Sequence, residues 1–125
     1  MTKTEYNLEE RTTKFSEDII VFLKIMRKDS INIPLINQLI RSATSIGANY
    51  FEANGAGSKK DFRNKICICK KEARETKYWL QLIAKSNLDK KEECRRFWQE
   101  AQELTLIFSK IIITIDKEKP AKINY

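Results

Sequence analysis

The most constraining feature of this sequence is a spacing of apolar residues at alternating steps of three and four, which recurs in four stretches. Over residues 58–87 it is kept by Phe62, Ile66, Cys69, Ala73, Thr76, Leu80 and Ile83. This spacing places the side chains along one face of an α-helix. Only 3 glycines and 2 prolines occur among 125 residues, so few positions favour turns. The pattern predicts an all-α fold and argues against a β-sandwich.

We expect one domain over residues 1–125, with helices at 7–28, 34–56, 58–87 and 89–117. Asn7, Ser58 and Asp89 each precede an acidic residue by three positions, which is the arrangement of a capped helix start. Pro34 suits the first position of a helix, and Gly55 suits a left-handed helix end. Four helices joined by short connections favour an antiparallel up-down-up-down four-helix bundle.

The third and fourth predicted helices carry more apolar surface than one bundle can bury. Six side chains lie outside the inner faces of these helices: Ile68, Tyr78, Trp79, Leu82, Leu106 and Ile113. Exposed apolar patches of this kind usually mark protein interfaces. We therefore predict that the chain forms a homo-oligomer and that these residues lie at the contacts between subunits.

A row of polar residues runs along the second predicted helix. Arg41, Ser45, Asn49 and Glu52 recur at helical spacing on the side opposite the apolar stripe. Arg41 and Glu52 can bond across helices or across subunits, or the row can hold a ligand. Because Glu52 would oppose a phosphate bound at Arg41, we favour the structural role and assign the row to the oligomer interface.

The sequence lacks the residue sets of the common enzymes. It contains no histidine, which removes the most frequent general base and metal ligand. Adjacent carboxylates such as Glu92 and Glu93 stand near helix starts, where capping explains them. No phosphate-binding loop, nucleophile elbow or Cys-x-x-Cys pair is present. We expect no enzyme activity, cofactor or metal, and no membrane segment. Cys67, Cys69 and Cys94 are expected to be reduced thiols in a cytoplasmic protein.

Positive charge is concentrated in the third predicted helix. The chain has 24 basic and 17 acidic residues, a net charge of +7, and residues 58–77 contribute 8 − 3 = +5 of it. Lysines at a helix start and along one helix side can bind phosphates. We assign nucleic-acid binding to six residues: Lys59, Lys60, Arg63, Lys70, Arg74 and Lys77. The alternative is that these side chains are solvated or pair with nearby carboxylates.

Three segments resemble one known family. Residues 41–53 (RSATSIGANYFEA), residues 58–62 (SKKDF) and residues 71–80 (KEARETKYWL) are similar to motifs of the bacterial 23S rRNA intervening-sequence proteins, a four-helix bundle family. The resemblance extends over residues 35–83. Two positions depart from the family pattern: Ile40 stands where the family has the first of two arginines, and Tyr50 replaces the usual isoleucine.

The resemblance implies a fold more than an activity, since the family has no defined biochemical activity. The family is similar to the accessory variability determinant proteins of diversity-generating retroelements. This resemblance implies that the chain forms a homopentamer and has a reverse-transcriptase-like or ribosomal partner. Our hypothesis is a non-enzymatic, homo-oligomeric protein that binds nucleic acid through its basic face, with RNA preferred over DNA. The alternative is a protein–protein adaptor whose basic face docks an acidic partner without nucleic acid.

Overall fold

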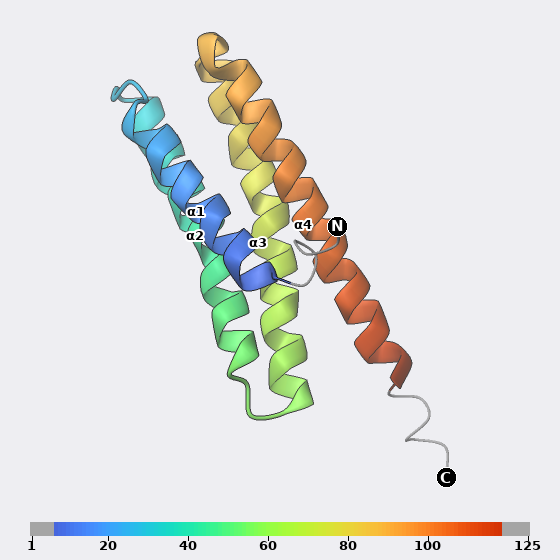
Figure 1. The fold of residues 1–125 in the computed structure, drawn as a ribbon. Helices are drawn as coiled ribbons and strands as arrows, with labels where there is room; N and C mark the ends of the chain where they lie inside the picture. The colour runs from blue at the N-terminus through green and yellow to red at the C-terminus, as the bar shows by residue number, and fades with distance from the viewer. Residues whose placement is uncertain (1–6, 119–125) are drawn as a thin grey trace.

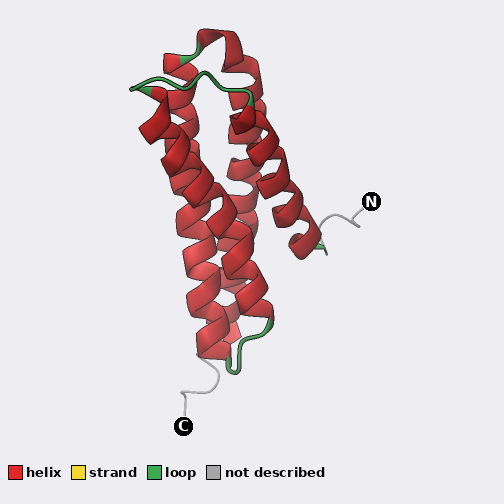
Figure 2. Ribbon diagram, turned by 90° about the vertical axis from the view of Figure 1, so that its left-hand side faces the viewer, coloured by secondary structure: helices red, strands yellow, loops and turns green. Residues whose placement is uncertain are grey.

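The computed structural model of the chain describes residues 7–118, which form helices joined by short loops (Figure 1). Its elements are α1 (Leu8–Lys24), α2 (Asn32–Asn54), α3 (Lys59–Ser86), the short 3-10 turn η2 (Leu88–Lys90) and α4 (Lys91–Glu118). The described residues contain no β-strand, and their loops lie at the ends of the helices (Figure 2). The all-α fold class is confirmed.

Contacts between neighbouring helices define how they are paired. Between α2 and α3, the hydroxyl oxygens of Ser42 and Thr76 are 3.0 Å apart. Asn32, the first residue of α2, bonds Asn87, which directly follows α3. On α3 and α4, the early Arg63 bonds the late Asp116. Figure 1 shows consecutive helices running in opposite directions, with α4 continuing past the start of the shorter α1.

The core follows the apolar spacing of the sequence. Ile66, Cys69, Ala73, Leu80 and Ile83 of α3 are buried, as the spacing predicts. They meet buried residues from the other three helices: Phe15, Ile19, Leu39, Ile46, Leu104 and Phe108. These residues form one cluster that holds the four helices together.

The bounds of the first two helices differ from those predicted. The first helix ends at Lys24 instead of residue 28, because the chain turns and places Met26 in the core. The Lys28 ammonium then donates hydrogen bonds to the carbonyl oxygens of Leu23 and Met26. Residues past the helix end therefore satisfy carbonyls that have no partner within the helix.

The second helix begins two residues earlier than predicted, at Asn32, since the Asp29 carboxylate accepts hydrogen bonds from the backbone of Ile31 and Asn32 at 3.0 and 2.7 Å. Pro34 is the third helical residue instead of the first, still within the turn where a missing N–H has no effect. Gly55 ends this helix with φ −100°, so the predicted left-handed ending is wrong.

Two of the three predicted caps are present. The side chains of Asn7 and Ser58 accept hydrogen bonds from the backbone N–H groups of Glu10 and Asp61, at 3.3 and 3.1 Å. The third is wrong, because Asp89 lies inside η2 and α4 begins at Lys91, two residues later than predicted. The Ser58 cap fixes the start of α3, the helix that carries the predicted basic face.

A pair of buried asparagines locks the α1–α2 connection to the end of α3. The Asn32 side chain donates to the Asn87 side-chain oxygen at 2.9 Å, and Asn87 donates back to the Asn32 oxygen at 3.0 Å. The Ser86 hydroxyl also donates to the Asn32 oxygen, at 3.0 Å. Both amides are buried, so each needs hydrogen-bond partners inside the protein, and each supplies two of the other's bonds.

Candidate nucleic-acid interface

The first part of the predicted basic face is paired with the end of α4. The Arg63 guanidinium forms two hydrogen bonds with the Asp116 carboxylate, at 2.7 and 2.8 Å, and these raise the pKa of Arg63. Lys59 forms a salt bridge with Glu118 at 2.7 Å. Lys60 is exposed in the same first turn of α3. The positive charge at this end is therefore partly balanced within the chain.

The middle of α3 presents a different environment. Lys70, Lys71, Arg74 and Lys77 line a pocket of about 530 Å³, with Tyr78, Trp98, Cys67, Glu75 and Gln81. None of the salt bridges among residues 7–118 includes Lys70, Lys71 or Arg74. This group, which we call the α3 basic pocket, concentrates positive charge around one carboxylate, that of Glu75, with which Lys70, Lys71 and Arg74 form no salt bridge.

Lys77 links the α3 basic pocket to α4. Its ammonium donates a hydrogen bond to the Gln102 side chain and lies 5.1 Å from the centroid of the Trp98 ring. Burial against α4, together with the nearby charge of Arg74, lowers the pKa of Lys77. The ring attracts the ammonium because its face carries negative electrostatic potential.

Two aromatic side chains form part of the pocket wall. Tyr78 has 54% of its surface exposed, and its ring meets the Trp79 ring edge-on at 5.0 Å between centroids. Trp98 packs partly against the core. The apolar spacing of α4 includes Trp98 in its inner face but does not indicate the contact with Lys77. That contact depends on how α3 and α4 are aligned along each other, which the sequence does not state.

The polar row of α2 makes its contacts within the chain. The Arg41 guanidinium bonds the Glu72 carboxylate at 3.1 Å and also the Glu75 carboxylate. Glu52 accepts a hydrogen bond from Lys65 at 2.6 Å. Arg41 and Glu52 thus bond across two helices of the same chain.

The other two residues of the polar row, Ser45 and Asn49, bond each other. The Asn49 side chain donates to both the backbone and side-chain oxygens of Ser45, at 2.9 Å each. Trp79 donates to Glu75 at 2.9 Å, and this hydrogen bond, with the charge of Arg41, lowers the pKa of Glu75. A contact of the row with a second subunit remains a prediction.

The apolar residues assigned to subunit contacts differ in exposure. Leu106 and Ile113 are 57% and 55% exposed, whereas Ile68, Trp79 and Leu82 are half-buried. The sequence does not predict a second apolar surface, which lies between α1 and α4. It is a groove of about 1140 Å³, and its wall includes Phe15, Phe22, Val21, Ile25 and Phe97. This groove forms because α1 and α4 meet at few positions, which no repeat in the sequence indicates.

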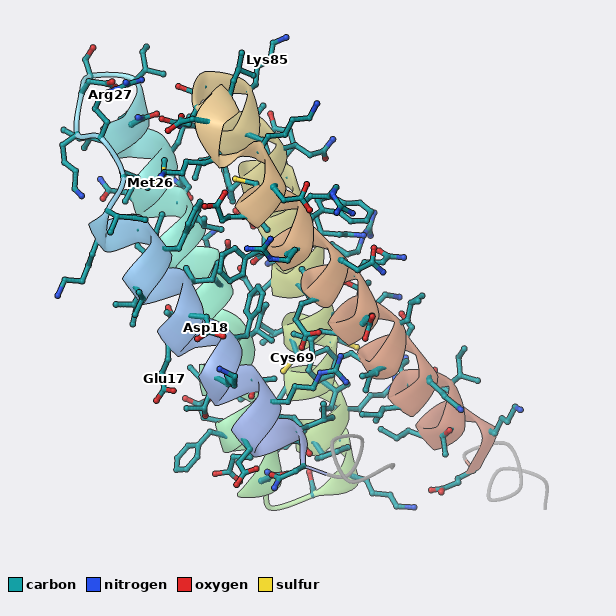
Figure 3. All side chains as sticks on the ribbon, turned by 45° about the horizontal axis from the view of Figure 1, so that its top comes forward. Glu17, Asp18, Met26, Arg27, Cys69 and Lys85 are labelled. Carbon is teal, nitrogen blue, oxygen red and sulfur yellow. The ribbon has the colours of Figure 1, made fainter. Side chains whose placement is uncertain are left out.

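The described residues show no constellation for redox or metal chemistry. Within residues 7–118, no three histidine, cysteine, aspartate or glutamate side chains are placed to hold a metal ion. The three cysteines are free thiols, and Cys69 lies inside the bundle (Figure 3). Burial raises the pKa of Cys69 to about 12 and that of Cys94 to about 11. None of the described helices is both long and apolar enough to span a bilayer.

Comparisons with known proteins agree with the motifs of α2 and α3. A family model described as the 23S rRNA-intervening sequence protein matches residues 4–110. The chain belongs to this family. It is also similar to the crystal structure, at 1.70 Å resolution, of a protein with unknown function from the S23 ribosomal protein family of Bacteroides thetaiotaomicron VPI-5482. That match has 33% identity and a TM-score of 0.76, and covers 83% of this chain and 93% of the other. No curated protein matches the sequence.

In this 23S rRNA-intervening sequence protein, several motif residues hold α2 against α3. Ser42 and Thr76 meet inside the bundle, and Arg41 reaches Glu72 and Glu75 at its surface. These motif residues therefore contribute to the contact between α2 and α3. The α3 basic pocket extends from α3 toward α4, where Lys77 meets Gln102 and Trp98. It shares Glu75 with the Arg41 contacts.

Proposed function

We propose that this chain is a non-enzymatic, homo-oligomeric protein that binds nucleic acid through the basic face of α3, with RNA preferred over DNA. The observation that carries the proposal is the α3 basic pocket, where Lys70, Lys71 and Arg74 gather beside two aromatic rings. Phosphate groups are the common ligands of such clusters. The preference for RNA rests on the family description, which names an intervening sequence of 23S rRNA.

The six basic residues differ in their expected contributions. Lys70, Arg74 and Lys77 form the centre of the surface, and Lys60 extends it at the helix start. Lys59 and Arg63 already bond carboxylates of α4, so a phosphate has to compete with Glu118 and Asp116 for them. We therefore expect substitutions at the centre to weaken binding more than substitutions at the helix start.

The subunit of the proposed assembly is an antiparallel up-down-up-down bundle. Leu106 and Ile113 supply exposed apolar surface for contacts between copies. Several copies would present several basic pockets to one nucleic-acid chain, and linked sites bind more tightly than one site alone. A pentamer, and a reverse-transcriptase-like or ribosomal partner, are the expectations that the family resemblance adds.

The test of nucleic-acid binding is a comparison of two charge-reversed variants. Lys70→Glu with Arg74→Glu changes the net charge from +7 to 7 − 4 = +3. The matched control is Lys24→Glu with Lys110→Glu, two exposed lysines on α1 and α4 that lie outside the pocket, because it changes the net charge equally. Binding of mixed-sequence RNA and DNA is measured by fluorescence anisotropy over a salt series.

The proposal predicts that wild type and control bind with affinity that falls as salt rises, and that the pocket variant binds more weakly and with a shallower salt dependence. Undetectable binding at low salt, or equal affinities of the two variants, would refute it. A protein partner that stays bound after nuclease treatment would favour the adaptor alternative instead.

The oligomer is tested separately by light scattering of the freshly purified chain. The proposal predicts a molar mass that is a multiple of 14.7 kDa, and a decrease in that mass for Leu106→Glu with Ile113→Glu. A single subunit at all concentrations measured would overturn this part of the proposal. The absorbance ratio at 260 and 280 nm in the same run reports nucleic acid that co-purifies.

A further inference from the structure

We propose that the α3 basic pocket holds an unpaired nucleotide, so that the preferred ligand is single-stranded RNA and not an RNA duplex. This inference rests on the proposed function and names its ligand class. It depends on the combination of exposed cations and exposed aromatic surface in one pocket. Either feature alone would leave the choice between single and double strands open.

The cations define where phosphates bind. Lys70 and Arg74 are four residues apart and therefore lie one turn apart on the same side of α3. Lys71 lies next to them on the pocket wall. Because none of the three is held in a salt bridge within the described chain, binding a phosphate breaks no salt bridge of theirs.

The aromatic rings define where a base binds. Tyr78 follows Arg74 by four residues and is 54% exposed, so part of its ring is open to the pocket. Trp98 forms the α4 side of the same pocket, with Lys77 over its ring. Because Lys77 lies over the Trp98 ring, the open stacking surface is the Tyr78 ring, on which a base can stack while its phosphate meets Lys70 or Arg74. The pocket volume of about 530 Å³ is in the range of sites that hold a small ligand.

A duplex cannot use the aromatic part of this pocket. Its bases are stacked on each other, and only its phosphates, riboses and groove edges are exposed to the protein. Proteins that bind single strands combine basic grooves with aromatic stacking, which is tolerant of sequence. The structure therefore assigns to Tyr78 a contact with the ligand, in place of the subunit contact that the sequence predicts.

The experiment compares single-stranded RNA of about 10 nucleotides with the duplex of the same sequence, for the full chain and two variants. Tyr78→Leu removes the aromatic ring but keeps an apolar side chain, and Tyr78→Phe keeps the ring. Wild type and Tyr78→Phe are expected to bind the single strand more tightly than the duplex. Tyr78→Leu is expected to weaken single-strand binding about fivefold or more and to leave duplex binding unchanged.

A spectroscopic measurement supplies a second readout that does not depend on Tyr78. The chain has two tryptophans, so Trp79→Phe leaves Trp98 as the only one. The inference predicts that the single strand quenches the fluorescence of Trp98 in this variant and that the duplex does so much less. Equal quenching by the two ligands would count against an unpaired base beside Trp98 in the pocket.

The outcomes separate this inference from the proposed function. If single strand and duplex bind equally, and Tyr78→Leu binds like wild type while Lys70→Glu with Arg74→Glu binds weakly, the inference is overturned and the proposed function stands. If no RNA binds, both are overturned. If Tyr78→Leu instead lowers the molar mass and weakens both ligands together, Tyr78 belongs to a subunit contact and the inference is wrong.

Discussion

Replacing Asn32 with alanine tests whether the buried asparagine pair holds the α2 start against the end of α3. The Asn32 side chain takes part in hydrogen bonds with the Arg27 carbonyl, both polar atoms of the Asn87 side chain, and the Ser86 hydroxyl. Two of these are fully buried, and the Asn87 side chain keeps only the hydrogen bond that it donates to the Ile83 carbonyl oxygen after the change. A lost hydrogen bond that leaves a buried polar atom unpaired costs about 1–3 kcal/mol. We therefore expect Asn32→Ala to lower the free energy of unfolding by about 3 kcal/mol.

The pair itself is measured by a double-mutant cycle with Asn87→Ala. Once one amide is absent, removing the other leaves no partner unpaired. The double variant should therefore be more stable than the sum of the two single effects predicts, by about 1–2 kcal/mol. Urea denaturation followed by circular dichroism measures each free energy at one fixed protein concentration. Asn37, exposed on the same helix, gives the control Asn37→Ala, which should change stability by less than about 0.5 kcal/mol. Strictly additive effects of Asn32→Ala and Asn87→Ala would refute the reasoning.

Three further predictions follow from ionisable groups. At pH 8 a thiol reagent should modify half-buried Cys67 in the native chain and should reach Cys69 and Cys94 only after unfolding. Fast reaction of all three thiols in the native chain would contradict the burial of Cys69 and Cys94. Since the pKa of Glu75 is lowered from 4.5, its ionised form stabilises the fold above that pH, and this stabilisation is lost as pH falls through the lowered pKa. Urea denaturation across this range should therefore show a smaller acid-induced loss for Glu75→Gln than for wild type, and equal losses would count against the Arg41 and Trp79 contacts. Asp116→Asn removes the charged partner of Arg63 and should strengthen RNA binding at low salt; a weaker affinity in the same anisotropy assay would show that the pair is needed to shape the surface.

Local signals in the sequence predict the elements of this fold well. The apolar stripe of α3 is buried as its spacing requires, and Ser58 caps the helix where its side chain can reach the Asp61 N–H. These features depend only on residues a few positions apart. The end of α1 depends instead on Met26 reaching the core, which is a tertiary contact, so the spacing extended that helix too far.

Only part of the candidate site could be predicted from the sequence, because the rest depends on tertiary contacts. The helical spacing alone places Lys70 and Arg74 on one side of α3. The pairing of Arg63 with Asp116, and of Lys77 with Trp98, depends on the alignment of α3 with α4 over distances of tens of residues in the sequence. Those contacts divide one continuous row of basic residues into an ion-paired end and an open centre.

The central claim, that RNA binds at the centre of α3, is tested most directly by lysine footprinting. The full chain is acetylated with and without single-stranded RNA, and the rate at each lysine is read by mass spectrometry. The account predicts that RNA slows modification of Lys70 and Lys71 while Lys24 and Lys110, exposed elsewhere, react at unchanged rates. Equal protection of all four lysines, or protection of Lys24 and Lys110 alone, would contradict it.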